Sequence, residues 1–294
     1  MFVNILAVAL AATAPATGDS GTQQPVAPAS WAKTCKPWDE WSKPAPPYRI
    51  YGNTYYVGTC GISAILVVGD KGAILIDGGP SDVGGLIAKN IEALGFTLSD
   101  VKILLETHEH FDHAGGLAEL KRLTGAKMLA SPDAARALEQ GGPIPKDPQF
   151  AEHGTFPKVA VDGLIRDGEV VRLGNLALKA HATPGHTAGA LSWSWKACDG
   201  KRCHTVAYVD SLSPVSSDSY RFSDHPTYLA AYRRSIAKVA KLPCDILLTP
   251  HPSQSAMVKR AASGTMIGAF TCAQRAKDLT EALDERLAKE AHGG

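Results

Sequence analysis

LLETHEHFDHAGG, residues 104–116, sets three histidines and an aspartate within six positions directly after an apolar run. In an extended segment, side chains two positions apart point to the same side, so His108 and His110 can bind one ion together. Asp112 and His113 follow where the chain turns toward the next apolar segment, and they can face a second ion. Imidazoles and a carboxylate packed this closely gain nothing from burial in a core, and the imidazoles would repel one another on protonation. The pattern therefore indicates metal binding.

Two further histidines lie in Pro-containing turns that follow apolar runs. His186 lies in TPGHT and His251 in LLTPHP, and such turns present a ligand rigidly. Five imidazoles and one carboxylate suit two zinc ions, with Zn–N distances of about 2.0–2.1 Å and a position left open for water. The other loop histidines are expected to be solvated or hydrogen-bonded rather than ligating: His153, His204, His225 and His292. For His181, a structural role beside the site and an exposed position remain equally open.

On both sides of residues 104–116, short apolar segments typical of β-strands alternate with segments whose apolar residues have helical spacing. Strands are expected within residues 48–58, 63–70, 72–79, 101–108, 169–186, 189–197, 204–211 and 245–251. Helices are expected at 81–96, capped by Ser81 or Asp82, and at 114–125, ended by Gly125, then at 227–242 and within 265–291. This alternation predicts an α/β fold.

The chain shows no linker between its two halves. We therefore expect one domain over residues 31–294, built from two similar halves in which strands precede helices. The histidine-bearing loops follow the carboxyl ends of strands, where open α/β sheets place their ligands.

Composition limits the classes of partner. The chain has 294 residues, of which 45% are hydrophobic, and its 30 basic and 29 acidic side chains leave a formal net charge of +1. This is ordinary globular composition. The balance gives no reason to expect a nucleic acid or an anionic membrane as a partner.

The N-terminus predicts a cleaved signal peptide over residues 1–16. Its apolar segment, Phe2 to Ala12, is shorter than the roughly 20 residues that span a bilayer, and Ala14 and Ala16 form a small-residue cleavage site before Thr17. No Lys or Arg precedes the segment, so a disordered Ala-rich tail is the alternative. Residues 17–30 are expected to be flexible.

Six cysteines bear on the same question. An even count behind a probable leader favours disulfides in an oxidising compartment, periplasmic or secreted, with no membrane anchor in the mature protein. Six cysteines allow 15 pairings. The most economical one joins neighbours along the chain, 35–60, 198–203 and 244–272, and six buried free thiols are the alternative.

Four motifs together resemble those of a known family. THEHFDHAGG, HATPGHTAG, AYVDSLS and LLTPHPS are similar to motifs of the metallo-β-lactamase superfamily and, within it, of subclass B3. The resemblance covers nearly everything after about residue 45. It implies an αβ/βα four-layer sandwich, two β-sheets flanked by helices, with the metals at one edge. By this resemblance Asp77, in LIDGG, is structural rather than ligating.

The resemblance also implies roles for individual residues. His108, His110 and His186 would bind the first zinc, and Asp112, His113 and His251 the second; these six would also be the catalytic residues. Ser211 and Ser213 would bind the carboxylate of a substrate.

The implied reaction is hydrolysis of the β-lactam amide bond of penicillins, cephalosporins and carbapenems by a hydroxide that bridges the metals, which confers antibiotic resistance. A monomer acting on a small-molecule substrate is expected. Segments 140–157 and 211–224 are expected to form the walls of the cleft.

Another binuclear zinc hydrolase of the superfamily, a glyoxalase II-like thioesterase or a lactonase, is the alternative. Those relatives carry an aspartate that bridges both metals near AYVDSLS. Adjacent strand residues face opposite sides. Either Ser211 faces the metals and Asp210 does not, which is expected for subclass B3, or a shift of one residue makes Asp210 the bridge.

Overall fold

A computed structural model describes residues 27–292, so the predicted signal peptide and residues 17–26 lie outside the described part. Helix α1 spans Pro28–Thr34. The prediction of a flexible segment up to residue 30 is therefore wrong at its C-terminal end. Trp31 accounts for the difference, since its fully buried ring packs 5.2 Å from Tyr48 and 5.1 Å from Tyr56, measured between ring centroids.

The first half of the chain forms a seven-stranded sheet in which spatial order follows chain order. Its strands β1 to β4 pair antiparallel, and β4 to β7 pair parallel. The strands are β1 (Tyr48–Tyr51), β2 (Thr54–Tyr56), β3 (Ile65–Gly69), β4 (Gly72–Ile76), β5 (Val101–Leu105), β6 (Lys127–Ala130) and β7 (Gly163–Leu164). The strands expected at residues 63–70 and 72–79 are confirmed as β3 and β4, which pair as an antiparallel hairpin.

The helices of this half are α2 (Gly84–Ala93), η1 (Leu98–Asp100), α3 (Phe111–Ala114), α4 (Leu117–Thr124) and α5 (Pro132–Gln140). The expected capping of α2 by Ser81 or Asp82 is wrong, because the helix begins after Val83 without a side-chain cap. The Asp82 carboxylate instead accepts a hydrogen bond from Ser42. The stop at Gly125 is confirmed, since its φ of 69° is the left-handed conformation that ends a helix.

The second half forms a five-stranded sheet in the order β12-β11-β10-β9-β8. Its strands are β8 (Val170–Leu173), β9 (Leu176–Ala182), β10 (Leu191–Asp199), β11 (Arg202–Tyr208) and β12 (Ile246–Leu248). Helical segments η2 (Phe222–Asp224) and α6 (Pro226–Val239) lie between β11 and β12. They are followed by η3 (Pro252–Ser255), α7 (Met257–Ala262) and α8 (Cys272–Ala291).

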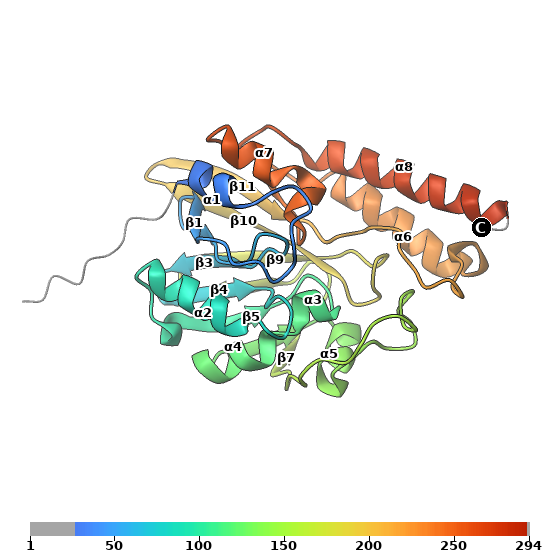
Figure 1. Ribbon diagram of the computed structural model, residues 1–294, viewed down its shortest axis with the longest axis horizontal. Coiled ribbons are helices and arrows are strands. Elements are labelled where there is room, and N and C mark those ends of the chain that lie inside the picture. Colours follow the sequence, from blue (N-terminus) through green and yellow to red (C-terminus); the bar gives the residue numbers. More distant parts are fainter. Residues whose placement is uncertain (1–26, 293–294) are drawn as a thin grey trace, which may run out of the picture.

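The two sheets lie face to face between layers of helices (Figure 1). Side chains from the facing strands, such as Ile74 and Trp193, share one buried cluster. A second cluster joins the outer face of the first sheet to α2, α4 and α5, as Ile87 of α2 illustrates. A third joins the second sheet to α6 and α8, with Leu247 and Leu279 as members. This is the expected αβ/βα sandwich.

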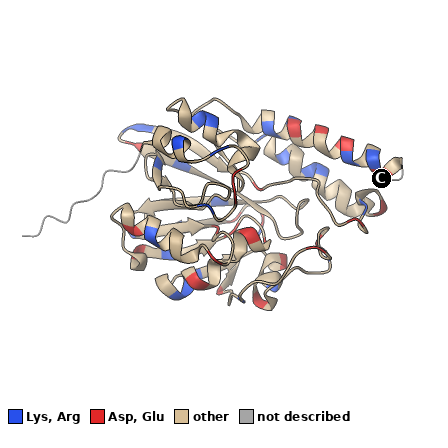
Figure 2. Cartoon of the chain, in the orientation of Figure 1, with Lys and Arg blue, Asp and Glu red and all other residues tan. Residues whose placement is uncertain are grey.

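The described residues form three disulfides, Cys35–Cys60, Cys198–Cys203 and Cys244–Cys272, which confirms the sequential pairing. Acidic and basic residues are mixed over the outer helices, α8 among them (Figure 2). Within the described part of the chain, none of the helices combines the length and the apolar character needed to cross a bilayer.

Candidate metal centre

Two groups of metal-binding side chains meet at the carboxyl ends of β5, β9 and β12. The first group is His108, His110 and His186, each of which offers one ligand atom within 4.8 Å of the others. His108 and His110 lie in the loop after β5, with side chains on one side as the two-residue spacing predicts. His186 comes from the turn after β9. Three imidazoles converging in this way suit the tetrahedral site of a zinc ion.

The second group adjoins the first. His108, Asp112 and His113 offer ligand atoms within 4.8 Å of one another. An Asp112 carboxylate oxygen lies 3.0 Å from Nε2 of His113 and 3.3 Å from Nε2 of His251, and these two nitrogens are 3.3 Å apart. Asp112 and His113 belong to α3, whereas His251 follows β12, so both halves of the chain contribute. The set of oxygen and nitrogen donors fits a second zinc ion.

The outward ring nitrogens of the first group lie close to protein oxygens, and Nδ1 of His108 also lies 3.3 Å from the Thr107 hydroxyl. Nδ1 of His108 lies 2.9 Å from the Asp210 carboxylate, and Nε2 of His110 lies 2.9 Å from Asp147. Nδ1 of His186 lies 3.0 Å from the backbone oxygen of Ser213. Such partners fix the tautomer and leave the other nitrogen free to bind a metal. Nε2 of His108 is buried and has no hydrogen-bond partner among the described residues, as expected of an atom that faces a metal.

The electrostatics of the cluster favour bound cations. Burial, reinforced by the neighbouring histidines, lowers the pKa of His108 well below its usual value and that of His186 to about 3. These imidazoles are therefore neutral at pH 7, with lone pairs available. Burial alone would also lower the pKa of His113, but the Asp112 carboxylate raises it above its ordinary value. The second group thus attracts positive charge, which a zinc ion would supply.

Comparisons with known proteins agree with this geometry. Residues 57–199 match the model of the metallo-beta-lactamase superfamily. The structure of the MIM-2 metallo-β-lactamase is 51% identical, with a TM-score of 0.87 over 91% of this chain and 100% of that one. MEM-A1, a subclass B3 metallo-β-lactamase isolated from a soil metagenome library, is 41% identical, with a TM-score of 0.82 over 87% of this chain and 100% of that one. This chain belongs to subclass B3 of the metallo-β-lactamases.

A more distant likeness extends to thioester hydrolases. A hydroxyacylglutathione hydrolase of Bradyrhizobium sp. (strain ORS 278) is 33% identical over 113 residues, which is 38% of this chain and 35% of that protein. The match thus spans about a third of the curated relative's length. By contrast, the matches to the solved metallo-β-lactamase structures cover most of this chain, 91% for MIM-2 and 87% for MEM-A1.

The loop that carries the two histidines of the first group is anchored on its opposite side. The Glu109 carboxylate, between His108 and His110, accepts hydrogen bonds from the Thr187 hydroxyl at 2.7 Å and from the Gly189 backbone N–H at 2.9 Å. A Cβ at Gly189 would lie 2.4 Å from a backbone nitrogen of α5, so only glycine allows this close approach. Glu109 therefore holds the His186 turn against the loop after β5.

Asp77 supports the start of the same loop. Its buried carboxylate accepts hydrogen bonds from the Thr107 backbone N–H at 2.7 Å and from the Tyr208 hydroxyl. Burial raises the pKa of Asp77 to about 6. The two metal-binding groups at this edge of the sheets do not include it. Asp77 thus stabilises the loop that presents His108.

The segment predicted to distinguish the subclass follows β11. Asp210 and Ser211 are both fully buried. Asp210 contacts His108 and belongs to neither metal-binding group of the described chain. The hydroxyl of Ser211 has no hydrogen-bond partner within residues 27–292, and the hydroxyl of Ser213 accepts a hydrogen bond from Gln254 at 3.1 Å. Ser213 thus adjoins the first group through its backbone oxygen, which lies 3.0 Å from Nδ1 of His186.

The two expected wall segments are joined to each other and to the first group. Asp147, from segment 140–157, contacts His110, and the backbone oxygen of the next residue, Pro148, accepts a hydrogen bond from the Ser217 backbone N–H at 2.9 Å. Phe150 on one segment is 48% exposed and Val215 on the other 47%, so each segment carries a solvent-exposed apolar side chain.

Sequence analysis missed several residues of this region. Trp41, 42% exposed, lies with its ring centroid 5.7 Å from that of His251, although its segment carries no metal-binding pattern. Asp147 was also overlooked, as were Gln254 and Arg275. Their positions depend on tertiary contacts, and only the placement of Asp147 within the Gly- and Pro-rich wall segment was a local signal.

The histidines expected to be non-ligating belong to neither metal-binding group. His153 stacks on His110 at 3.9 Å between centroids and contacts Gln149. His204 packs against Tyr51, and exposed His225 stacks on Tyr220. His292 is exposed. The open question of His181 is settled in favour of a structural role, because it is buried on β9 and contacts the Ser194 hydroxyl at 2.8 Å.

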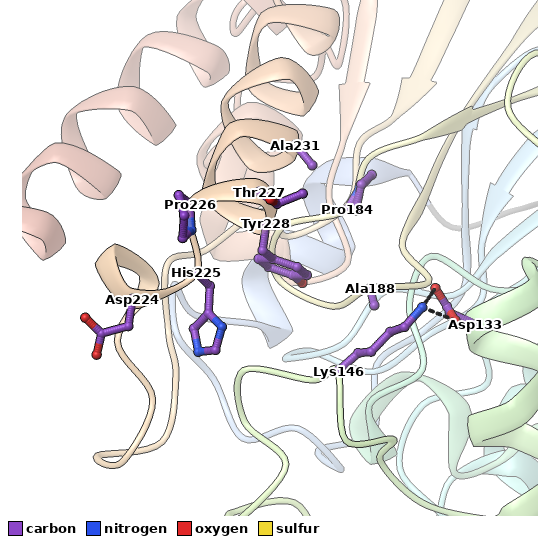
Figure 3. Close-up of a pocket in the computed structure, with 10 residues that line it drawn as sticks. All are labelled: Asp133, Lys146, Pro184, Ala188, Asp224, His225, Pro226, Thr227, Tyr228 and Ala231. Atoms are coloured by element: carbon purple, nitrogen blue, oxygen red, sulfur yellow. Dashed lines mark hydrogen bonds and ion pairs between the residues drawn. The ribbon is translucent and has the colours of Figure 1, made fainter.

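A separate cavity of about 610 Å³ lies behind the His186 turn (Figure 3). Pro184 and Ala188 line it from that turn, Tyr228 from α6, and an ion pair between Lys146 and Asp133 closes its other side. None of the residues that line it belongs to the metal-binding groups. The cavity is therefore separate from the metal centre.

Proposed function

We propose that this chain hydrolyses the amide bond of β-lactam antibiotics, penicillins, cephalosporins and carbapenems among them, and so confers resistance to them. The position of Asp210 is the observation that favours a β-lactamase over a glyoxalase II-like thioesterase. Its carboxylate contacts Nδ1 of His108, whereas the glyoxalase-like alternative requires an aspartate that bridges the metals at this point. Two metallo-β-lactamases that this chain matches over their whole length support the same choice.

Six side chains would hold the two zinc ions. His108, His110 and His186 bind the first, and Asp112, His113 and His251 bind the second. When bound, such a pair of ions lowers the pKa of a water molecule to near 7 and polarises the carbonyl that this water attacks.

The protein's own residues orient the reactants. Asp112 lies between both groups, and a carboxylate oxygen there can accept a hydrogen bond from the attacking water and fix its direction. Ser211 and Ser213 bind the substrate carboxylate and place the lactam bond over the metals. The apolar side chains of Phe150, Val215 and Trp41 pack on the body of the drug and exclude bulk water.

We further propose that the protein acts as a monomer in the periplasm or outside the cell. Support comes from the six metal-binding residues, which all belong to one chain, and from the three disulfides, which form in oxidising compartments.

One comparison tests the proposed activity. The same zinc-loaded preparation is assayed with a carbapenem and with a glutathione thioester. We expect the carbapenem to be opened and the thioester to remain intact. Activity should disappear when a chelator removes the metal and return with added zinc. If the protein hydrolyses the thioester and does not open the lactam, it is a glyoxalase II-like thioesterase and the proposed function is wrong.

A further inference from the structure

Arg275 of α8 places a buried positive charge directly behind the serine loop, residues 211–213. The side chain is 8% exposed and forms no ion pair with any described residue. Its guanidinium donates instead to three neutral oxygens, the Ser211 carbonyl at 2.7 Å, the Gln254 carbonyl at 3.3 Å and Gln254 Oε1 at 3.2 Å. Burial lowers the pKa of Arg275 to about 10, so it is still charged at neutral pH. No carboxylate of the described residues lies within ion-pair distance of this charge, so part of its positive potential reaches the loop.

The guanidinium fixes the direction of the Gln254 amide. A guanidinium has only donors, so the side-chain atom of Gln254 that faces it must be the oxygen. The amide nitrogen is therefore turned the other way, toward Ser213, where Nε2 lies 3.1 Å from the hydroxyl oxygen. Since the amide nitrogen can only donate, the Ser213 oxygen is the acceptor in this bond.

The hydroxyl proton of Ser213 is then free to point elsewhere. No acceptor for it lies among the described residues, and the side chain is partly exposed. The backbone oxygen of the same residue contacts His186, so Ser213 itself borders the first metal-binding group. We propose that Gln254, held by Arg275, is a positioning residue that keeps the Ser213 hydroxyl as a donor toward the carboxylate of the substrate.

This inference rests on the proposed β-lactam hydrolysis and assigns the recognition of an anionic substrate to a chain of three residues. It distinguishes two substitutions of one residue. Gln254→Glu has the same shape and would pair with Arg275, but its carboxylate can only accept. The Ser213 hydroxyl would turn to it and be lost to the substrate. Gln254→Ala removes the amide that orients the Ser213 hydroxyl, but it adds no acceptor that would turn this hydroxyl away from the substrate.

The test compares a chromogenic cephalosporin that carries a carboxylate with its methyl ester. For the carboxylate, we expect Gln254→Glu to raise KM roughly ten- to a hundredfold, as loss of a hydrogen bond to a charged group predicts, with kcat within about threefold. Gln254→Ala should give a smaller increase. For the ester, which carries no charge to recognise, KM should be the same in all three proteins. Ser213→Ala should raise KM for the carboxylate, and adding Gln254→Glu to it should change little more.

Gln274→Glu is the matched control, because it adds the same charge at an exposed position one residue before Arg275. Its KM should equal that of the wild type. A second measurement does not depend on turnover: calorimetry with hydrolysed benzylpenicillin, which keeps the carboxylate. The Kd of this ligand should weaken in Gln254→Glu and be unchanged in Gln274→Glu.

The two proposals fail in different ways. If the wild type opens the lactam and Gln254→Glu has the wild-type KM, the inference about Gln254 is wrong and the proposed function stands. If the wild type opens no lactam, the proposed function is wrong. The role of Gln254 is then tested by the Kd of hydrolysed benzylpenicillin, measured by calorimetry. Equal affinity in wild type and Gln254→Glu, or no binding by either, would then overturn the inference.

Discussion

Each histidine of the first metal-binding group has a protein partner on its outward nitrogen. The partners differ: Asp210 and Asp147 contribute carboxylates to His108 and His110, whereas His186 contacts a backbone oxygen. A carboxylate raises the basicity of the imidazole that donates to it more than a carbonyl does, so it strengthens the bond of that imidazole to a metal. We therefore expect the two carboxylates to contribute to metal affinity without touching the metal.

Asp210→Asn tests this role. Asparagine keeps an oxygen that can accept from Nδ1 of His108, so the variant should still bind two zinc ions per chain. Loss of the carboxylate charge should weaken zinc binding by roughly ten- to a hundredfold. Elemental analysis after dialysis gives the stoichiometry, and competition with a chromophoric chelator gives the affinity. Carbapenem turnover at saturating zinc should persist.

The opposite result would identify a different enzyme. If Asp210 bridges the metals, Asp210→Asn should lose zinc even when it is supplied in excess. Ser217→Ala, a change in the neighbouring wall segment, is a suitable control because its side chain contacts only Pro148 and Ser219 among the described residues.

At this scale, the sequence predicted which candidate ligands lie together better than it predicted the residues that contact them. His108, His110, Asp112 and His113 are close in the chain, and their spacing alone brings their side chains together. Asp147 and Arg275 reach the site only through the folded structure. No local pattern identifies such residues, because the distance that matters is a distance in space.

Helix α8 depends on a covalent link at its first residue. The disulfide of Cys272 joins it to Cys244, just before β12, and closes a separation of 28 residues. Cys198–Cys203 has a separation of 5 and links residues that the β10–β11 pairing already sets opposite each other. The first bond therefore restricts the unfolded chain far more than the second.

Replacing the two cysteines of a disulfide by serine should show this difference. The Cys244→Ser/Cys272→Ser protein should lose about 3–4 kcal/mol of unfolding free energy, and the Cys198→Ser/Cys203→Ser protein about 2 kcal/mol or less. Urea unfolding of both variants and of the wild type gives the values. Equal losses, or the reverse order, would show that chain entropy is not what these bonds contribute.

The elements that sequence analysis missed fall into two kinds. Helix α5 carries a local signal, since Ser131 caps it by accepting from the Ala134 N–H, and Pro132 occupies its first turn. That signal was overlooked. Helix α7 has only six residues and no side-chain cap, and it is held by burial of Met257 and Ala261 in the core between the sheets. Periodicity over so short a segment cannot distinguish a helix from a loop.

For the whole molecule, the metal centre makes stability depend on pH when zinc is absent. The folded pKa values of His186 and His251, about 3 and about 4, lie below the ordinary value of about 6.5, chiefly because both side chains are buried. The unfolded chain therefore takes up protons first as the pH falls. The stabilising contribution is complete above about pH 6.5 and is lost progressively as the pH falls toward 4.

We expect the unfolding free energy of the metal-free protein to fall between pH 7 and pH 5 by on the order of 2 kcal/mol for each of these histidines. Urea unfolding of the chelator-treated protein at several pH values measures it. In the double variant His186→Gln/His251→Gln the dependence should be shallower, and the part due to His108 should remain. The same steep slope in that variant would show that other groups cause it.

The hydrogen bond between Pro148 and Ser217 has a consequence for how such an enzyme changes its substrate range. It joins segments 140–157 and 211–224, and the first of these also reaches the metal-binding loop through Asp147. We therefore expect a change in one segment to affect the other. A loop grafted from a relative into only one of them would meet a partner shaped for the original. Transfer of a drug profile between relatives should therefore require both segments to be exchanged together, and selection for a new antibiotic should yield paired substitutions, one in each.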